Sequence, residues 1–233
     1  MFAYLLAVGL VLVVEFPWVI LFWILNKNGN RSIKLVLKTF IFAFFTGVIA
    51  TFLQFGLINY FDLQFTLYNS LILLSLYSLF IIAIPEEMAK YIPVKNFAFF
   101  HFKNPFDAVF YGVVSAVGVN LAKNLYITIG LASDISQLKK HIFILVLYLF
   151  VNSTKQVFLT LIWATELGFS LVDRNREKYL TYVFLFAFFL HAILDAILFK
   201  GVYLLLIIIL LVSAIILFIN LFELYKISKK IKN

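Results

Sequence analysis

The chain has 233 residues, of which 64% are hydrophobic and 13% are charged, and its mean hydropathy is +1.07. Soluble domains are close to half apolar and a quarter charged, so this composition indicates a polytopic membrane protein without a sizeable soluble domain. The net charge of +8 is typical of the loops and tail of such a protein and gives no evidence for nucleic-acid binding. The absence of cysteine excludes disulfides, thiol catalysis and thiolate metal sites.

Hydropathy divides the chain into seven segments, each near the ~20 residues that a helix needs to cross a bilayer. The predicted spans cover residues 1–25, 33–58, 67–91, 105–129, 142–167, 179–199 and 202–227. We expect all of them to be helices, because a span in lipid must satisfy its own backbone hydrogen bonds. No internal repeat or linker interrupts them. The prediction is an all-α, polytopic membrane bundle that forms a single transmembrane domain over residues 1–233.

Basic residues predict the orientation of this bundle. Fourteen of the 19 Lys and Arg residues flank the first, third and fifth connections or lie in the tail: Lys27, Arg31, Lys34, Lys38, Lys90, Lys95, Lys103, Arg174, Arg176, Lys178, Lys226, Lys229, Lys230 and Lys232. The opposite side holds Lys139, Lys140 and Lys200. Because cytoplasmic loops are enriched in Lys and Arg, we expect a cytoplasmic carboxyl terminus and an outside amino terminus, in a prokaryotic cytoplasmic membrane.

Two adjacent acids interrupt the third span. Glu86, Glu87 and Lys90 follow directly on a long uncharged run, and ionisable groups in or beside a span indicate a functional site. On a helix, Lys90 reaches both acids at i+3 and i+4. Two neighbouring carboxylates in a low-dielectric site cannot easily both ionise, which suits a carboxyl group that holds and releases a proton. The alternative is that these charges mark the cytoplasmic end of the span and sit in water.

Later spans carry three further polar elements. Asn120 and Asn124 share one helical face, where they form interhelical hydrogen bonds or contribute to a site. The polar run 152–156 is implausible against lipid and predicts a face toward the bundle interior or a wet cavity. His191 and Asp195 lie four residues apart, so the carboxylate can accept a hydrogen bond from the imidazole and fix its tautomer.

Four motifs in chain order carry a family resemblance: Glu86-Glu87-x-x-Lys90, Asp107-x-x-x-Tyr111-Gly112, Gly118 followed six residues later by Asn124, and His191-Ala-Ile-Leu-Asp195. Over about residues 85–199 the chain resembles the PrsW group of intramembrane proteases, which belongs with the CAAX-protease and bacteriocin-processing (CPBP) membrane proteins. The resemblance implies a helical membrane bundle in which a glutamate matching Glu86 or Glu87 activates water for peptide-bond hydrolysis, assisted by histidine and asparagine groups.

The chain departs from the PrsW pattern at two positions. Lys123 stands where the family usually has a glutamate, and Lys155 stands where it usually has a histidine. Lysines beside the acidic pair favour a buried salt-bridge cluster, in which a permanently paired glutamate is a poor general base.

Two functional hypotheses follow. The first is a glutamic-type intramembrane endopeptidase that acts on a membrane protein or lipopeptide precursor. Its expected catalytic residues are Glu86, Glu87, His191, Asn124 and Asp195, supported by Lys90, Asn120, Lys123 and Lys155. The glutamates activate water, His191 shuttles protons, Asp195 orients the histidine, and Asn124 polarises the carbonyl. The second is a catalytically silent relative that binds transmembrane segments, or a small membrane protein that couples protons or ions.

We expect no cofactor and no metal, because one intramembrane histidine without cysteine would leave a zinc site built mostly of carboxylates. We also predict that His191 and the two glutamates line one cavity, close enough for a water to bridge them. At ~1.5 Å per residue, however, Glu86 falls in the cytoplasmic half of its span and Asp195 toward the outer half. Their meeting therefore requires the third span to be shifted outward, or a wet cleft to reach inward.

Overall fold

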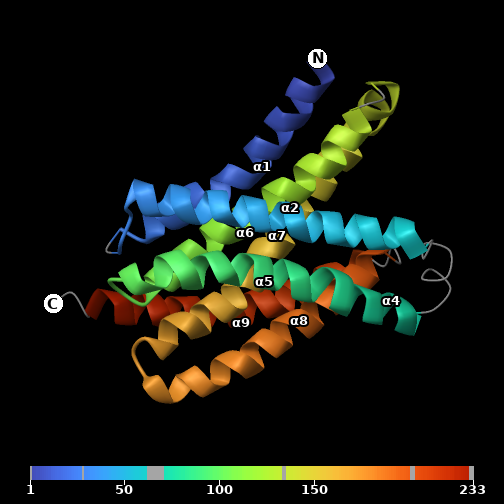
Figure 1. Cartoon of the computed structure of the whole chain (residues 1–233). Coiled ribbons are helices and arrows are strands. Elements are labelled where there is room, and N and C mark those ends of the chain that lie inside the picture. Colours follow the sequence, from blue (N-terminus) through green and yellow to red (C-terminus); the bar gives the residue numbers. More distant parts are fainter. Residues whose placement is uncertain (1, 28, 62–70, 133–134, 200–202, 231–233) are drawn as a thin grey trace.

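The computed structural model describes residues 2–27, 29–61, 71–132, 135–199 and 203–230, and within them the chain is helical with short connections and no strand. The helices are α1 (Phe2–Leu25), α2 (Ile33–Phe61), α4 (Leu71–Tyr77), η1 (Ser78–Ala83), α5 (Ile84–Pro93), η2 (Val94–Ala98), η3 (Phe99–His101), α6 (Phe106–Ala132), α7 (Ile135–Ser170), η4 (Arg174–Arg176), α8 (Glu177–Phe199) and α9 (Tyr203–Lys230). Figure 1 shows them as one bundle of long helices.

Among the described residues, six helical stretches are long and apolar enough to cross a membrane. They are Ala3–Leu25, Ile33–Leu57, Ile72–His101, Phe106–Leu131, Ile142–Ser170 and Glu177–Leu198. The 28-residue helix α9 covers the seventh predicted span. These lengths and compositions confirm the predicted all-α, polytopic membrane bundle.

The third span is longer than predicted. It was expected to cover residues 67–91, of which 67–70 lie outside the described residues, but the helical stretch runs on to His101. Pro85 lies in the first turn of α5 inside a helical stretch that continues through it, and the π-helical segments η1 and η2 flank α5. Because proline has no N–H to donate, it interrupts the backbone hydrogen bonds of the span next to η1. The acidic pair therefore lies midway along the span, so the interpretation of these charges as a solvated span end is wrong.

Helix α6 is the centre of the bundle and packs against α1, α2, α5 and α7. Glycines allow its close approach to α2. A Cβ on Gly118 would lie 2.8 Å from the Phe40 carbonyl oxygen, and one on Gly47 would lie 2.7 Å from the Val119 Cα. Because any side chain at these positions would separate the two helices, the glycines keep α2 and α6 close enough to contribute to one site.

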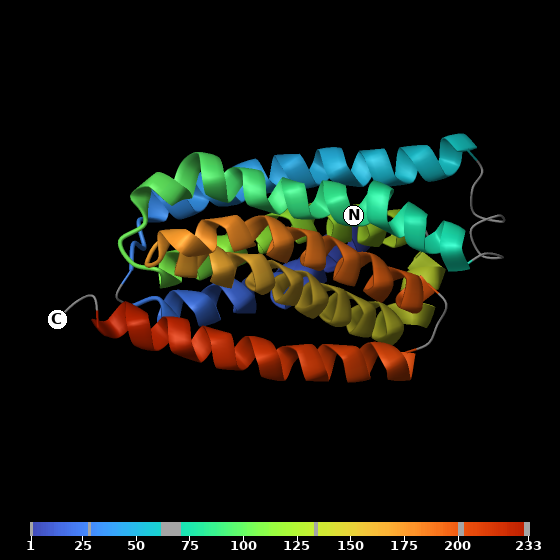
Figure 2. The ribbon, with the colours of Figure 1, turned by 90° about the horizontal axis from the view of Figure 1, so that it is seen from below.

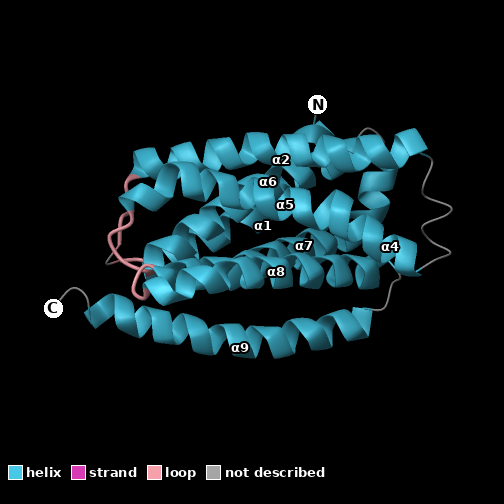
Figure 3. Ribbon diagram, turned by 60° about the horizontal axis from the view of Figure 1, so that its bottom comes forward, coloured by secondary structure: helices cyan, strands magenta, loops and turns pink. Residues whose placement is uncertain are grey.

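Figure 2 shows the α1–α2, η3–α6 and α7–α8 connections at the same end of the bundle as the end of α9. Helix α9 lies on the outside of the bundle, beside α7 and α8 (Figure 3). Lys90 does not belong among the basic residues expected at this end, because it is fully buried within the bundle. Lys200, Lys232 and the side chains of Lys139 and Lys140 lie outside the described part of the chain.

Candidate active site

A cluster of ionisable side chains lies in the middle of the bundle. Four helices contribute to this ion cluster: α5 supplies Glu86, Glu87 and Lys90, α6 supplies Lys123, α7 supplies Lys155, and α8 supplies His191 and Asp195. All seven side chains are buried. A buried charge is tolerated only when it is paired, so the carboxylates and amines are expected to contact one another.

Each carboxylate of the ion cluster is bound by one ammonium group. Lys90 Nζ donates to Glu87 Oε1 at 2.5 Å. Lys123 donates to Glu86, and Lys155 donates to Asp195. Three acids are therefore matched by three amines, which explains how so many charges are buried within a membrane bundle.

His191 joins the three acids. Its Nδ1 lies 2.9 Å from Glu87 Oε1, and its Nε2 lies 3.4 Å from Glu86 Oε2 and 3.3 Å from Asp195 Oδ2. The predicted meeting of His191 with the glutamates is thus observed, as a direct contact rather than through a water. The objection from membrane depth fails because the third span extends to His101 and places both glutamates at its middle. With carboxylates at both ring nitrogens, the imidazole is positioned to exchange a proton with either glutamate.

Neutral donors complete the hydrogen bonds of the glutamates. Glu86 Oε1 accepts from Gln54 Nε2 at 2.8 Å, and its Oε2 accepts from Gln156 Nε2 at 2.5 Å. Glu87 Oε2 accepts from the Trp163 indole at 3.1 Å. Sequence reasoning included Gln156 only as part of a polar run and missed Gln54 and Trp163. Gln54 could have been predicted as a site residue, because it is an isolated amide in an apolar span. Nothing in the sequence distinguishes Trp163 from the other aromatic residues.

Asn120 and Asn124 lie in a second polar group, which is centred on an acid of the first span, Glu15. Glu15 of α1 is fully buried and accepts from Asn120 Nδ2 at 2.5 Å, Asn124 Nδ2 at 2.7 Å and Ser153 Oγ at 2.9 Å. The amide of Asn152 donates to both asparagine oxygens, at 3.0 and 3.1 Å. Asn124 donates to Glu15 and accepts from Asn152, and among the described residues no hydrogen bond joins its side chain to the ion cluster. This polar clamp, Glu15 with its three asparagines and Ser153, joins α1, α6 and α7.

We expect Glu15→Ala to destabilise the protein by about 1–3 kcal/mol for each donor left unpaired in the polar clamp. Glu15→Gln keeps one acceptor oxygen and should lose less. Thermal and denaturant unfolding in detergent measure both changes, with Glu177→Ala on the exposed start of α8 as the control. Equal stability of Glu15→Ala and Glu177→Ala would contradict this role for Glu15.

Asp107, from the second motif, lies away from the ion cluster. Its Oδ1 accepts from Asn26 Nδ2 and from the backbone N–H of Asn30, both at 2.8 Å. Its Oδ2 accepts from the backbone N–H groups of Lys103 and Asn104 at 2.5 and 3.1 Å. Asp107 thus ties the α1–α2 connection to the start of α6 and has a structural role.

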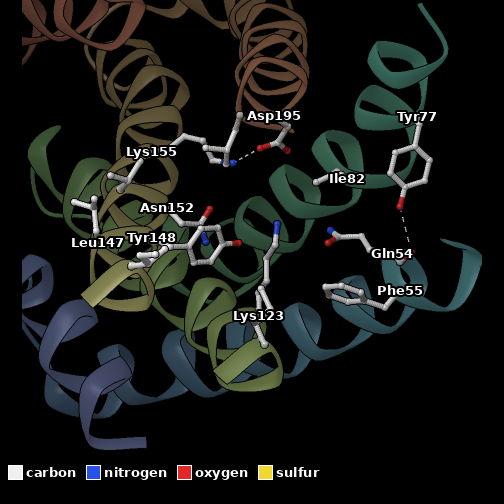
Figure 4. A pocket seen from close by; sticks show the side chains of 14 residues that line it. Gln54, Phe55, Tyr77, Ile82, Lys123, Leu147, Tyr148, Asn152, Lys155 and Asp195 are labelled. Atoms are coloured by element: carbon white, nitrogen blue, oxygen red, sulfur yellow. Dashed lines mark hydrogen bonds and ion pairs between the residues drawn. The ribbon is translucent and has the colours of Figure 1, made fainter. Parts of the chain in front are cut away.

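A cavity of about 740 Å³ lies beside the ion cluster. Figure 4 shows Lys123 reaching from α6 toward Lys155 and Asp195 on the opposite wall. Glu86, Glu87 and His191 are not among the side chains that line the cavity. This cavity does not meet the prediction that the three residues line one cavity; it is lined instead by Lys123 and Asp195, which contact Glu86 and His191.

The helical bundle and its composition define a polytopic membrane protein, with the ion cluster buried among its candidate membrane spans. Residues 31–221 match the sequence profile described as PrsW family intramembrane metalloprotease, and the chain belongs to this family of intramembrane proteases. The match extends well beyond the predicted resemblance over residues 85–199 and leaves out α1, which carries Glu15. No curated protein and no solved structure matches the chain.

The family's description implies a metal ion, and the side chains of this site do not fit one. Every carboxylate of the ion cluster has an ammonium group in direct contact, which competes with a cation for the same oxygen atoms. The single histidine has carboxylates at both ring nitrogens. In the described part of the chain, no group of three or more His, Cys, Asp or Glu residues is arranged to hold a metal.

Proposed function

We propose that this protein is a glutamic-type intramembrane endopeptidase, in which a glutamate activates water to hydrolyse a peptide bond. The observation that carries the proposal is the contact of His191 with both glutamates at the middle of a membrane span. Membership of an intramembrane protease family supports the reaction class. A glutamate beside an imidazole is a competent pair for general acid–base catalysis.

Glu86 is the better candidate for the base. Its partner Lys123 lines the cavity, so a substrate in the cavity comes closer to Glu86 than to Glu87. Glu87 is enclosed by Lys90, Trp163 and His191, which suits a residue that holds the histidine.

In this mechanism the substrate carbonyl draws the Lys123 ammonium away from Glu86, which frees a carboxylate oxygen to take a proton from water. Lys123 then stabilises the developing oxyanion. His191 receives the proton from Glu86 at Nε2 and delivers it to the leaving amine, while Glu87 accepts from Nδ1–H and fixes this tautomer, and Asp195 beside Nε2 stabilises the imidazolium that forms. Asn124, expected to polarise the carbonyl, has no role in this mechanism because its amide donates to Glu15.

The proposed substrates are membrane-embedded proteins or lipopeptide precursors. A site at the middle of a span is reached from within the bilayer, and the cavity beside it is lined largely by apolar side chains. These surroundings favour a substrate segment that is itself apolar.

A second candidate function is binding of transmembrane segments without hydrolysis. The observation that favours it is the pairing of every acid in the ion cluster with a lysine. If these pairs persist when a substrate is bound, no carboxylate lone pair is available for water and the protein acts as a silent relative.

Cleavage of candidate membrane-protein substrates by the purified protein separates the two functions. We expect cleavage in H₂¹⁸O to place the label in the new carboxyl group, and Glu86→Gln to reduce the rate by about 10²–10⁴-fold. Glu166→Gln, a half-buried acid outside the ion cluster, is the matched control and should retain activity. Substrate that co-purifies uncleaved with both wild type and Glu86→Gln would favour the silent binder.

We further propose that the end of α9 is cytoplasmic and the start of α1 is outside. Most basic residues lie in the connections at the α9 end, which supports this orientation. A reporter that is active only in the cytoplasm should work when it is fused after Asn233 and fail when it is fused before Met1. The reverse pattern would overturn the assignment.

A further inference from the structure

The cavity beside the ion cluster has two chemically distinct parts. Most of its wall is apolar, with Phe55, Ile127, Leu147 and Val151 among the lining side chains. Its charged part consists of Lys123, Lys155 and Asp195. Both lysines are paired, but Glu86, the partner of Lys123, is not among the lining residues, so the cavity wall presents two ammonium groups beside one carboxylate.

The two lysines at the cavity have hydrogen-bonding capacity left over. An ammonium group has three N–H donors. Among the described residues, Lys90 donates to both Glu87 and Gln156, whereas Lys123 and Lys155 each donate to one carboxylate. The lysines with spare donors are the two that line the cavity, so a ligand there can supply acceptor oxygens to both.

The cavity also has a rim that faces lipid. Ile144 and Leu147 line it from the membrane-spanning part of α7 and are 63% and 54% exposed. On a transmembrane helix, exposed apolar side chains contact the acyl chains of the bilayer. A volume of about 740 Å³ lies within the range of ~300–1,000 Å³ typical of small-molecule sites, which suits one acyl chain better than two.

We propose that this cavity binds a fatty acid, whose carboxylate accepts hydrogen bonds from Lys123 and Lys155 and whose single chain lies along the apolar wall. The proposal is independent of peptide hydrolysis and holds equally for a silent protein. Because Lys123 also contacts Glu86, the bound carboxylate competes with Glu86 for the same ammonium group. A fatty acid in the cavity thus acts on the ion cluster without touching the glutamates.

The test uses the full-length protein in nonionic detergent, with hexadecanoate and hexadecanol compared at equal mole fractions in the micelle. We expect native mass spectrometry to find one hexadecanoate per chain and thermal unfolding to shift upward. Hexadecanol lacks the charged head and should bind roughly tenfold more weakly or worse. Equal binding of the alcohol would overturn the proposal, as would tighter binding of a single-chain phosphate lipid.

Substitution of Lys123 or Lys155 would remove the proposed partners of the fatty-acid carboxylate, but it would also break the ion pairs with Glu86 and Asp195 and could impair folding. Variants that fill the cavity test the site while both lysines stay in place. Leu147→Trp places a bulky ring at the rim and should abolish hexadecanoate binding while leaving the ion cluster paired. Phe150→Trp lies on the same helix, is equally exposed at 55% and does not line the cavity, so it should bind as wild type does. Unchanged binding by Leu147→Trp would place the fatty acid elsewhere and refute the assignment.

Discussion

Lys123→Ala and Lys155→Ala are each expected to lower the free energy of unfolding by about 3–5 kcal/mol. Each substitution leaves a buried carboxylate without its ammonium partner: Glu86 in the first case and Asp195 in the second. An unpaired charge within a membrane bundle is destabilising because neither water nor lipid can solvate it. Denaturant unfolding in detergent measures the loss, and Lys34→Ala, at an exposed lysine of α2, should change stability little.

A double-mutant cycle distinguishes loss of the pair from loss of packing. The cycle compares Asp195→Asn, Lys155→Met and the variant that carries both; the double variant removes both charges at similar volume, so it should lose less stability than Lys155→Met alone. Unchanged stability in both alanine variants would mean that the lysines do not hold the ion cluster together. In that case the idea of a silenced enzyme would lose its main support.

The second large expected effect concerns metal. We expect the purified wild-type protein to contain no stoichiometric divalent metal and to keep its melting temperature in EDTA. The double variant Lys123→Glu/Lys155→His removes two ammonium groups and introduces one carboxylate and one imidazole. With the existing acids and His191 it has two histidines and four carboxylates, a donor set that suits zinc.

We therefore expect this double variant to bind about one zinc ion per chain. It should lose thermal stability in EDTA, because Glu86 and Asp195 no longer have lysine partners and depend on the metal for a positive charge. Metal analysis of the purified protein and melting curves with and without chelator provide the measurements. Lys34→Glu/Lys95→His, which makes the same changes at exposed positions, is the control. Stoichiometric zinc in the wild type would show that the ammonium groups do not exclude it.

The bundle was predictable from the sequence because apolar length alone determines where helices cross a membrane. Six predicted spans correspond to helices of membrane-crossing length among the described residues, and α9 occupies the place of the seventh. The predicted end of the third span was wrong because Glu86, Glu87 and Lys90 were interpreted as lying close to the boundary between the membrane and water. Their burial depends on ion pairing with other helices, which hydropathy along one helix does not report.

The composition of the ion cluster was predictable, but its pairing was not. Isolated charges in spans indicated that Glu86, Lys123, Lys155 and His191 belong together, since each is unfavourable against lipid. Which lysine meets which acid depends on helix rotation and depth. Glu15 was visible as an acid of the first span, but its partners Ser153 and Asn124 are 138 and 109 residues away, so the polar clamp could not be predicted.

The order of the charged helices along the chain also constrains how the protein is made. The carboxylate that pairs with Lys155 and the imidazole that touches both glutamates are on α8, the last helix to contribute to the ion cluster. Chains are synthesised from the amino terminus, so α7 emerges from the ribosome before its partner exists. A nascent chain stopped before α8 therefore carries Lys155 in a membrane helix without its carboxylate partner, so stable burial of that lysine has to wait for α8.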